Sequence, residues 1–262
     1  MPHIQLKDVN LYYEQQGEGP NLVMVAGLGV DHSMWNTEYF AKDFRVTVLD
    51  NRGAGQSSTP KGPWSMKVMA ADVIALCDAL GIKKAHFVGH SMGGHITQMI
   101  GALYPQYCDK LVIACSEQFF SIISRLATNQ QIVLMNYNLP PRVLLQNYLP
   151  LLFSMDFLEN EDKVNAFLDF MLDNPYAQSP EGYILQTEAL RTHDSRPLLE
   201  RIKAPSLILG CEDDLLTPLK NSQYLAKHIS NATLKVIPNC GHAPFVEYPE
   251  MFNQMILDYL KN

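Results

Sequence analysis

Clusters of positive charge are missing from this sequence. Its 262 residues include 20 lysines and arginines against 27 aspartates and glutamates, for a net charge of −7, and the two signs are interspersed. Nucleic acids and anionic membrane surfaces are bound by cationic stripes. We therefore expect neither a nucleic acid nor a membrane as a partner.

Cysteines are few, and neither a leader nor a long apolar run is visible. The cysteines are odd in number, scattered, and without a Cys-x-x-Cys pair: Cys77, Cys108, Cys115, Cys211 and Cys240. This arrangement disfavours a disulfide framework and a zinc site and is typical of a reducing compartment. The first residues lack the charged and apolar regions of a signal peptide, and no apolar stretch could span a membrane. We expect a soluble, cytoplasmic protein.

Patterns of buried strands and amphipathic helices alternate along most of the chain. A near-continuous apolar run predicts a strand at 21–26, and further strands are expected at 44–49, 84–88, 111–115, 204–210 and 233–237, after an antiparallel pair within 4–15. Helical spacing predicts helices at 33–41, 65–80, 93–103, 219–229 and 249–260. This alternation predicts the α/β class, with a mostly parallel central sheet and helices on both faces.

The pattern changes between residues 117 and 196, where no buried strand is expected. Helical patterns cover 119–135, 142–152, 161–172 and 181–191, with breaks expected at Pro140-Pro141, Pro150 and Asn174-Pro175. We expect 117–196 to be a helical cap inserted into a core domain made of 1–116 and 197–262. It would lie over the C-terminal edge of the sheet, where ligands bind in open α/β sheets.

The stretch from Phe87 to His95 predicts a strand, a Gly-x-Ser-x-Gly turn and the start of a helix. Such a turn holds its central Ser91 at strained dihedrals, and Gly89 and Gly93 are needed because any Cβ there would collide with neighbouring elements. The helix N-terminus would stabilise negative charge beside the hydroxyl. A turn of this kind fits a simple loop as well as a nucleophile, so its partners decide.

A serine nucleophile needs a histidine base, and that base needs a carboxylate to fix its tautomer and stabilise its charge. Both follow expected strands. Three adjacent acids, 212–214, come after the strand at 204–210, and His242 comes after the strand at 233–237. The chain order of serine, acid and histidine is the one found in α/β hydrolases.

Four ordered motifs make the sequence similar to the α/β-hydrolase superfamily over essentially its whole length. They are the Ser91 turn, the loop Asp50-Asn51-Arg52-Gly53-Ala54-Gly55-Gln56-Ser57, the segment 210–218, and Gly241-His242-Ala243-Pro244 with the residues up to Pro249. The resemblance implies the α/β-hydrolase fold with Ser91, Asp214 and His242 as catalytic residues. It favours Asp214 over Asp213 because the family's acid commonly lies four residues before its loop proline. No cofactor or metal is implied.

The loop after the strand at 21–26 departs from the family pattern. Family members often carry His-Gly-x there, whereas this chain has Ala26-Gly27-Leu28-Gly29. The donors of an oxyanion hole are backbone N–H groups. The resemblance therefore still assigns Leu28 to the oxyanion hole, and the geometry of the turn assigns Met92. Gly27 and Gly29 are expected to contact the substrate.

Other residues near these motifs have simpler interpretations. His90 and His95 flank Ser91, but no nearby ligand spacing suggests zinc, and we expect both to be buried packing residues. Arg52 is expected to pin its loop rather than bind substrate, and Cys115 to be a small buried apolar residue. Aromatic and methionine side chains of the cap should divide between core and pocket: Phe119, Phe120, Met135, Tyr137, Tyr148, Phe153 and Met155.

Within the superfamily, the sequence looks closest to small carboxylesterases and enol-lactonases of the 3-oxoadipate type. This resemblance implies a serine hydrolase, monomeric or homodimeric, that cleaves a small apolar ester or lactone through an acyl-enzyme. Two alternatives stay open. One is a C–C bond hydrolase of ring-cleavage products, whose usual glycine-rich loop is absent; the other is a small-ligand receptor that reuses the hydrolase pocket.

Overall fold

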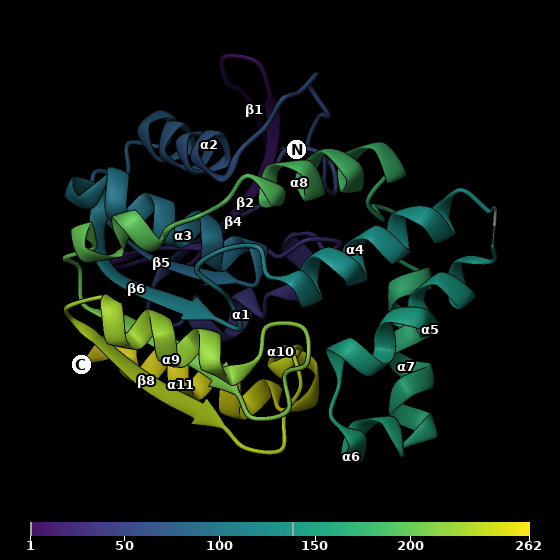
Figure 1. The fold of residues 1–262 in the computed structure, drawn as a ribbon. Coiled ribbons are helices and arrows are strands. Elements are labelled where there is room, and N and C mark those ends of the chain that lie inside the picture. Colours follow the sequence, from purple (N-terminus) through teal and green to yellow (C-terminus); the bar gives the residue numbers. More distant parts are fainter. Residues whose placement is uncertain (1, 138) are drawn as a thin grey trace.

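The computed structural model describes residues 2–137 and 139–262, and an eight-stranded sheet forms its centre (Figure 1). The spatial order is β1 (His3–Gln5), β2 (Asn10–Gln16), β4 (Arg45–Leu49), β3 (Asn21–Val25), β5 (Ala85–His90), β6 (Cys108–Ala114), β7 (Ser206–Cys211) and β8 (Ala232–Ile237). β1 and β2 pair antiparallel, and the strands from β4 to β8 run parallel. The predicted mostly parallel sheet is confirmed.

Helices cover both faces of the sheet. On one face lie α2 (Met66–Ala79), α3 (Met92–Leu103) and α9 (Leu219–His228), and on the other lie α1 (Thr37–Phe40) and α11 (Pro249–Lys261). Successive side chains of a strand point to opposite faces. In β3, Val23 and Val25 therefore pack with the first group, and Leu22 and Met24 with the second. Burial on both faces explains the continuous apolar runs.

A helical segment, residues 117–196, separates β6 from β7. It contains α4 (Ile122–Met135), α5 (Pro141–Leu152), α6 (Met155–Leu158), α7 (Glu161–Leu172) and α8 (Pro180–Arg191), and these helices extend to one side of the sheet (Figure 1). It has its own cluster of buried side chains, among them Phe153 and Leu168. A β-bridge joins Phe119 to Asp194, so the two ends of the segment lie side by side.

Two local predictions were wrong, and one short helix was not predicted. Residues 33–41 form two short helices instead of one, the 3₁₀ helix η1 (His32–Met34) and α1, because the side chains of Asp31 and Asn36 each cap a separate turn. Pro150 does not end a helix but lies inside α5. The preceding residue, Leu149, is buried in the core of the helical segment. The short α10 (Pro244–Glu247) was not expected.

The remaining 3₁₀ helices are short connectors, η2 (Pro105–Tyr107) and η3 (Arg196–Arg201). Over the described residues, no helix combines the length and the apolarity that crossing a membrane would require.

Arg52 pins the loop after β4, as expected. Its guanidinium is 2% exposed and donates two hydrogen bonds to Asp72 of α2, at 2.6 and 2.7 Å, and two longer ones to Asp8. Its aromatic neighbour is Trp64, whose ring centroid lies 5.6 Å away. A buried pair of this kind is costly to break from one side, because the remaining charge loses its partner.

Arg52→Met is therefore expected to lower the free energy of unfolding by about 3 kcal/mol, since it leaves Asp72 buried without its cation. Lys84→Met serves as the control. Lys84 forms an exposed pair with Asp109, and losing such a pair should cost less than about 1 kcal/mol. Urea unfolding followed by circular dichroism measures both. Equal losses in the two variants would contradict the structural role given to Arg52.

Candidate active site

Ser91 lies in a sharp turn between β5 and α3. Its backbone has φ 54° and ψ −117°, a region that residues other than glycine rarely adopt. A Cβ at Gly89 would lie 2.1 Å from the carbonyl oxygen of Gly93, and a Cβ at Gly93 would lie 2.0 Å from that of Val25. Only glycine fits either position, so the strained turn expected from the sequence is confirmed.

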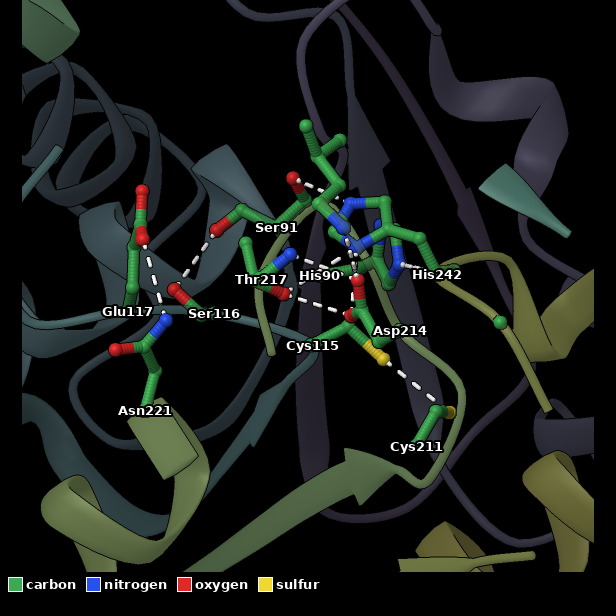
Figure 2. A network of polar contacts seen from close by, with 12 residues as sticks. His90, Ser91, Cys115, Ser116, Glu117, Cys211, Asp214, Thr217, Asn221 and His242 are labelled. Carbon is green, nitrogen blue, oxygen red and sulfur yellow. Dashed lines mark hydrogen bonds and ion pairs between the residues drawn. The ribbon is translucent and has the colours of Figure 1, made fainter. Parts of the chain in front are cut away.

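Two further side chains reach Ser91 from other strand ends (Figure 2). His242 follows β8, and its Nε2 is 2.9 Å from the Oγ of Ser91. Asp214 follows β7, and its Oδ2 is 2.8 Å from the Nδ1 of His242. Parallel strands bring their carboxyl ends to one edge, which is why residues so distant in the sequence meet. Asp213 and Glu212 are exposed and do not take part.

The carboxylate of Asp214 is buried but well supplied with hydrogen bonds. Its Oδ1 accepts from the backbone N–H groups of Leu216 (2.9 Å) and Thr217 (2.7 Å), and its Oδ2 accepts from the Thr217 hydroxyl (2.7 Å). Burial alone would raise the pKa of Asp214, but the His242 ring and these bonds outweigh it and hold the pKa below its ordinary value. Asp214 therefore stays ionised beside His242.

The backbone around His242 is held from two sides. His90 donates from Nε2 to the carbonyl oxygen of His242, at 2.8 Å, and burial lowers the pKa of His90 to about 3, so its ring is neutral. Glu247 of α10 accepts from the N–H of Gly241 (2.8 Å) and also from the N–H of Ser154 (3.2 Å). Glu247 lies within the motif that begins at Gly241, but no role was predicted for it, and its contact with Ser154 of the helical segment could not be read from the sequence.

The loop after β3 packs against the Ser91 turn. A Cβ at Gly27 would come within 3.3 Å of the Cβ of Ser91, so glycine permits this close approach. Leu28, Gly29 and Met92 line the same cavity as Ser91. The N–H of Gly29 donates to the side chain of Gln178 (3.0 Å), which in turn donates to the carbonyl oxygen of Gly53 (2.9 Å). Gln178 thus holds the loop from the helical segment; no sequence pattern indicated it.

A cavity of about 560 Å³ opens over Ser91, between the sheet edge and the helical segment. This size is within the usual range for small-molecule sites. Aromatic and methionine side chains of residues 117–196 fall into three groups. Phe120, Met135 and Tyr148 line the cavity, Phe153 belongs to the core of the helical segment, and Tyr137 and Met155 are exposed. Phe119 packs beneath Arg196, 4.7 Å from its guanidinium carbon to the ring centroid.

His95 also lines the cavity, contrary to a role in packing alone. It is buried and stacks on His193, with ring centroids 4.6 Å apart. Burial lowers the pKa of both rings, to about 4 for His193, so this pair is neutral. Cys115 is fully buried as expected, with its sulfur 3.5 Å from that of Cys211.

Among the described residues, one group could supply three metal-ligating atoms, Asp31, His32 and Asp50. These atoms already have partners in the protein. His32 lies 2.8 Å from Asp50, and Asp31 accepts from Asn174. Burial would lower the pKa of His32, but the bond to Asp50 and the neighbouring acidic charges outweigh it and raise the pKa. The group is an internal hydrogen-bonded cluster that ties the loop after β3 to its surroundings.

A family model described as the alpha/beta hydrolase fold matches residues 20–249. The chain belongs to the α/β-hydrolase fold family.

This α/β hydrolase is 33% identical over 260 residues to 3-oxoadipate enol-lactonase 2 of Acinetobacter baylyi, a match that covers 97% of this chain and 94% of that one. It is 35% identical over 261 residues to a provisionally named carbamate hydrolase, RutD, of Serratia proteamaculans, covering 95% and 96%. The crystal structure of the enol-lactonase from Burkholderia xenovorans LB400 matches with a TM-score of 0.90 and 28% identity, covering 100% of both chains. The resemblance to enol-lactonases is confirmed.

Proposed function

We propose that this α/β hydrolase cleaves a carboxylic ester or lactone through an acyl-enzyme on Ser91. The observation that carries the proposal is the pair of contacts Ser91 Oγ to His242 Nε2 (2.9 Å) and His242 Nδ1 to Asp214 Oδ2 (2.8 Å), at a cavity that Ser91 and His242 both line. A hydroxyl, a base and an orienting carboxylate in this order are what nucleophilic catalysis requires.

In the proposed reaction, the bond to Asp214 keeps a proton on Nδ1 of His242, which leaves Nε2 free to accept the proton of Ser91. The serine oxygen then attacks the carbonyl carbon. His242 returns the proton to the leaving alcohol, and the acyl group stays on Ser91. A water molecule, deprotonated by His242, attacks the acyl-enzyme. His242 then gives that proton to the departing oxygen of Ser91, which releases the acid and regenerates the enzyme.

The backbone N–H groups of Leu28 and Met92 are the proposed oxyanion donors. Met92 begins α3, and the first N–H groups of a helix have no acceptor within the helix. Leu28 lies in the loop that packs on the Ser91 turn and that Gln178 holds in place. Removing one such donor typically costs roughly 3 kcal/mol of transition-state stabilisation.

We further propose that residues 117–196 act as a cap domain on a core of residues 1–116 and 197–262. Its helices supply most of the apolar lining of the cavity, including Leu144, Leu145, Phe167 and Met171. The ends of the segment are joined by the bridge between Phe119 and Asp194, which supports an insertion into the core. A cap of this kind would set the size of the acyl group that the cavity accepts.

Carbamate hydrolysis is the second candidate, on the strength of the 35% identical relative with that name.

The third candidate is hydrolysis of a 3-oxoadipate-type enol-lactone. An enol-lactone of 3-oxoadipate, a dicarboxylic acid, closes its ring through one carboxyl group and keeps the other free, so a cavity for it should balance a negative charge. A C–C bond hydrolase or a ligand receptor would use the same Ser91, His242 and Asp214. Turnover of esters and lactones distinguishes these alternatives from the proposed hydrolysis.

The test is a panel of p-nitrophenyl esters of increasing acyl length, unsubstituted γ- and δ-lactones, and a p-nitrophenyl carbamate. We expect the best ester or lactone to reach kcat/KM of about 10⁴ M⁻¹s⁻¹ or more, the lower end of ordinary enzyme efficiency. The carbamate should be slower by at least about 100-fold, because its nitrogen lone pair reduces the electrophilicity of the carbonyl carbon. A carbamate faster than every ester would favour the second candidate. Tight ligand binding without turnover would favour a receptor.

A further inference from the structure

The charged side chains that line the cavity over Ser91 are mostly acidic. Of the described residues that line it, none is a lysine or an arginine, whereas two are carboxylates, Asp31 and Glu117. The histidines His90 and His95 do not supply positive charge either, since burial lowers the pKa of both. The remaining histidine, His242, is the proposed base.

The two carboxylates are not equivalent. Asp31 accepts from Asn174 and from the N–H of Ser33, and it also has a basic side chain nearby, because the Nδ1 of His32 lies 3.9 Å away. Glu117 follows β6 and is only 1% exposed. Its two oxygens accept from the N–H of Ser121 (3.0 Å) and from the amide of Asn221 (3.3 Å; Figure 2), which are both neutral donors.

The rest of the cavity wall is neutral. Ser124, Thr128 and Gln131 of α4 face it at helical spacing, and the side-chain oxygen of Gln131 is buried without a hydrogen-bond partner among the described residues. A buried acceptor of this kind gains from a donor on the ligand. The opposite wall, from α5 and α7, is apolar. An uncharged acyl group with a hydroxyl or amide N–H fits this lining.

We propose that the cavity selects uncharged esters and lactones over those that carry a carboxylate, and that Glu117 is the residue that sets this preference. This inference rests on the proposed hydrolysis. A carboxylate that enters the cavity loses its hydration without gaining a cation. Burial already raises the pKa of Glu117, so a second negative charge beside it either meets the ionised Glu117 at low dielectric or forces Glu117 to take up a proton, and both cost free energy. The free carboxylate of a 3-oxoadipate-type lactone would be rejected for the same reason.

The experiment compares two matched substrates, the mono-p-nitrophenyl ester of adipic acid and the same ester with its free carboxylate converted to a primary amide. The pair has nearly the same shape and differs in charge. Each is assayed with wild type, Glu117→Gln and Glu159→Gln. Glu159 is an exposed carboxylate at the end of α6 that does not line the cavity, which makes its variant the matched control.

We expect wild type to prefer the amide ester by about 30-fold or more in kcat/KM, the size of a like-charge interaction across about 8 Å at an effective dielectric near 20. Glu117→Gln should narrow that ratio at least about fivefold, and Glu159→Gln should leave it unchanged. Equal wild-type rates on the two esters would overturn the charge selection. A ratio that Glu117→Gln does not change would overturn the role of Glu117.

The ratio of the wild-type kcat/KM values for the two adipate esters tests the selection against charged substrates even if Glu117→Gln does not fold. The plain hexanoate p-nitrophenyl ester, measured in parallel, separates the two levels of the account. Hydrolysis of the hexanoate with equal rates on the adipate pair would leave the esterase proposal standing and overturn the charge selection. If wild type hydrolyses none of the three esters, the proposed function itself is overturned.

Discussion

Ser91→Ala is expected to lower kcat for the best ester by about 10⁵-fold or more, because it removes the proposed nucleophile and leaves only binding and oxyanion contacts. The fold should survive. The Oγ of Ser91 contacts only His242 among the described hydrogen bonds, and the backbone of the turn is fixed by Gly89 and Gly93. Steady-state ester hydrolysis measures the loss, and thermal unfolding checks the fold.

Ser33→Ala is the control for this variant. Ser33 lines the same cavity but lies in η1, away from His242, so its loss should change kcat by less than about threefold. Residual activity above about 1% in pure Ser91→Ala protein would show that another group acts as the nucleophile.

Asp214→Asn is expected to lower kcat by about 10⁴-fold, the effect of presenting a histidine base in the wrong tautomer. The carboxylate of Asp214 accepts hydrogen bonds at both oxygens, from Leu216, Thr217 and His242. An asparagine amide has only one acceptor oxygen, so it cannot replace all of these bonds. Asp213→Asn is the matched control, one residue earlier in the same loop. Asp213 is exposed, and its variant should stay within about threefold of wild type.

The pair of variants also tests the choice of acid. A larger loss in Asp213→Asn than in Asp214→Asn would mean that the loop rearranges in solution and that the contact to His242 belongs to a different carboxylate. Both kcat and KM should be followed, because the orienting role predicts a loss in kcat with little change in KM.

Much of the sheet could be predicted from the sequence because its central strands are buried on both faces. The runs in β3 and β7 are apolar at nearly every position, which reflects packing on both sides. The capped helix α2 was also predicted, with Ser65 accepting from the N–H of Val68 and Gly81 at φ +71°. These signals are local, so the sequence displays them directly.

The candidate site was predictable where its residues follow strands, and not where it depends on long-range contacts. Ser91, Asp214 and His242 each come just after a predicted strand. Gln178 holds Gly29 across 149 residues of sequence, and Glu247 reaches Ser154 across 93, so neither contact could be read from a local pattern. The divided helix at 33–41 was missed because helical spacing does not show that Asn36 caps a new turn.

The central claim is a covalent acyl group on Ser91, and the most direct test is mass spectrometry with p-nitrophenyl trimethylacetate, whose hindered acyl group deacylates slowly. After an acid quench during turnover, the account predicts enzyme that carries one trimethylacetyl group, on the peptide that contains Ser91. Ser91→Ala should gain none. Steady release of p-nitrophenol from unmodified enzyme, or an acyl group on a different residue, would contradict it.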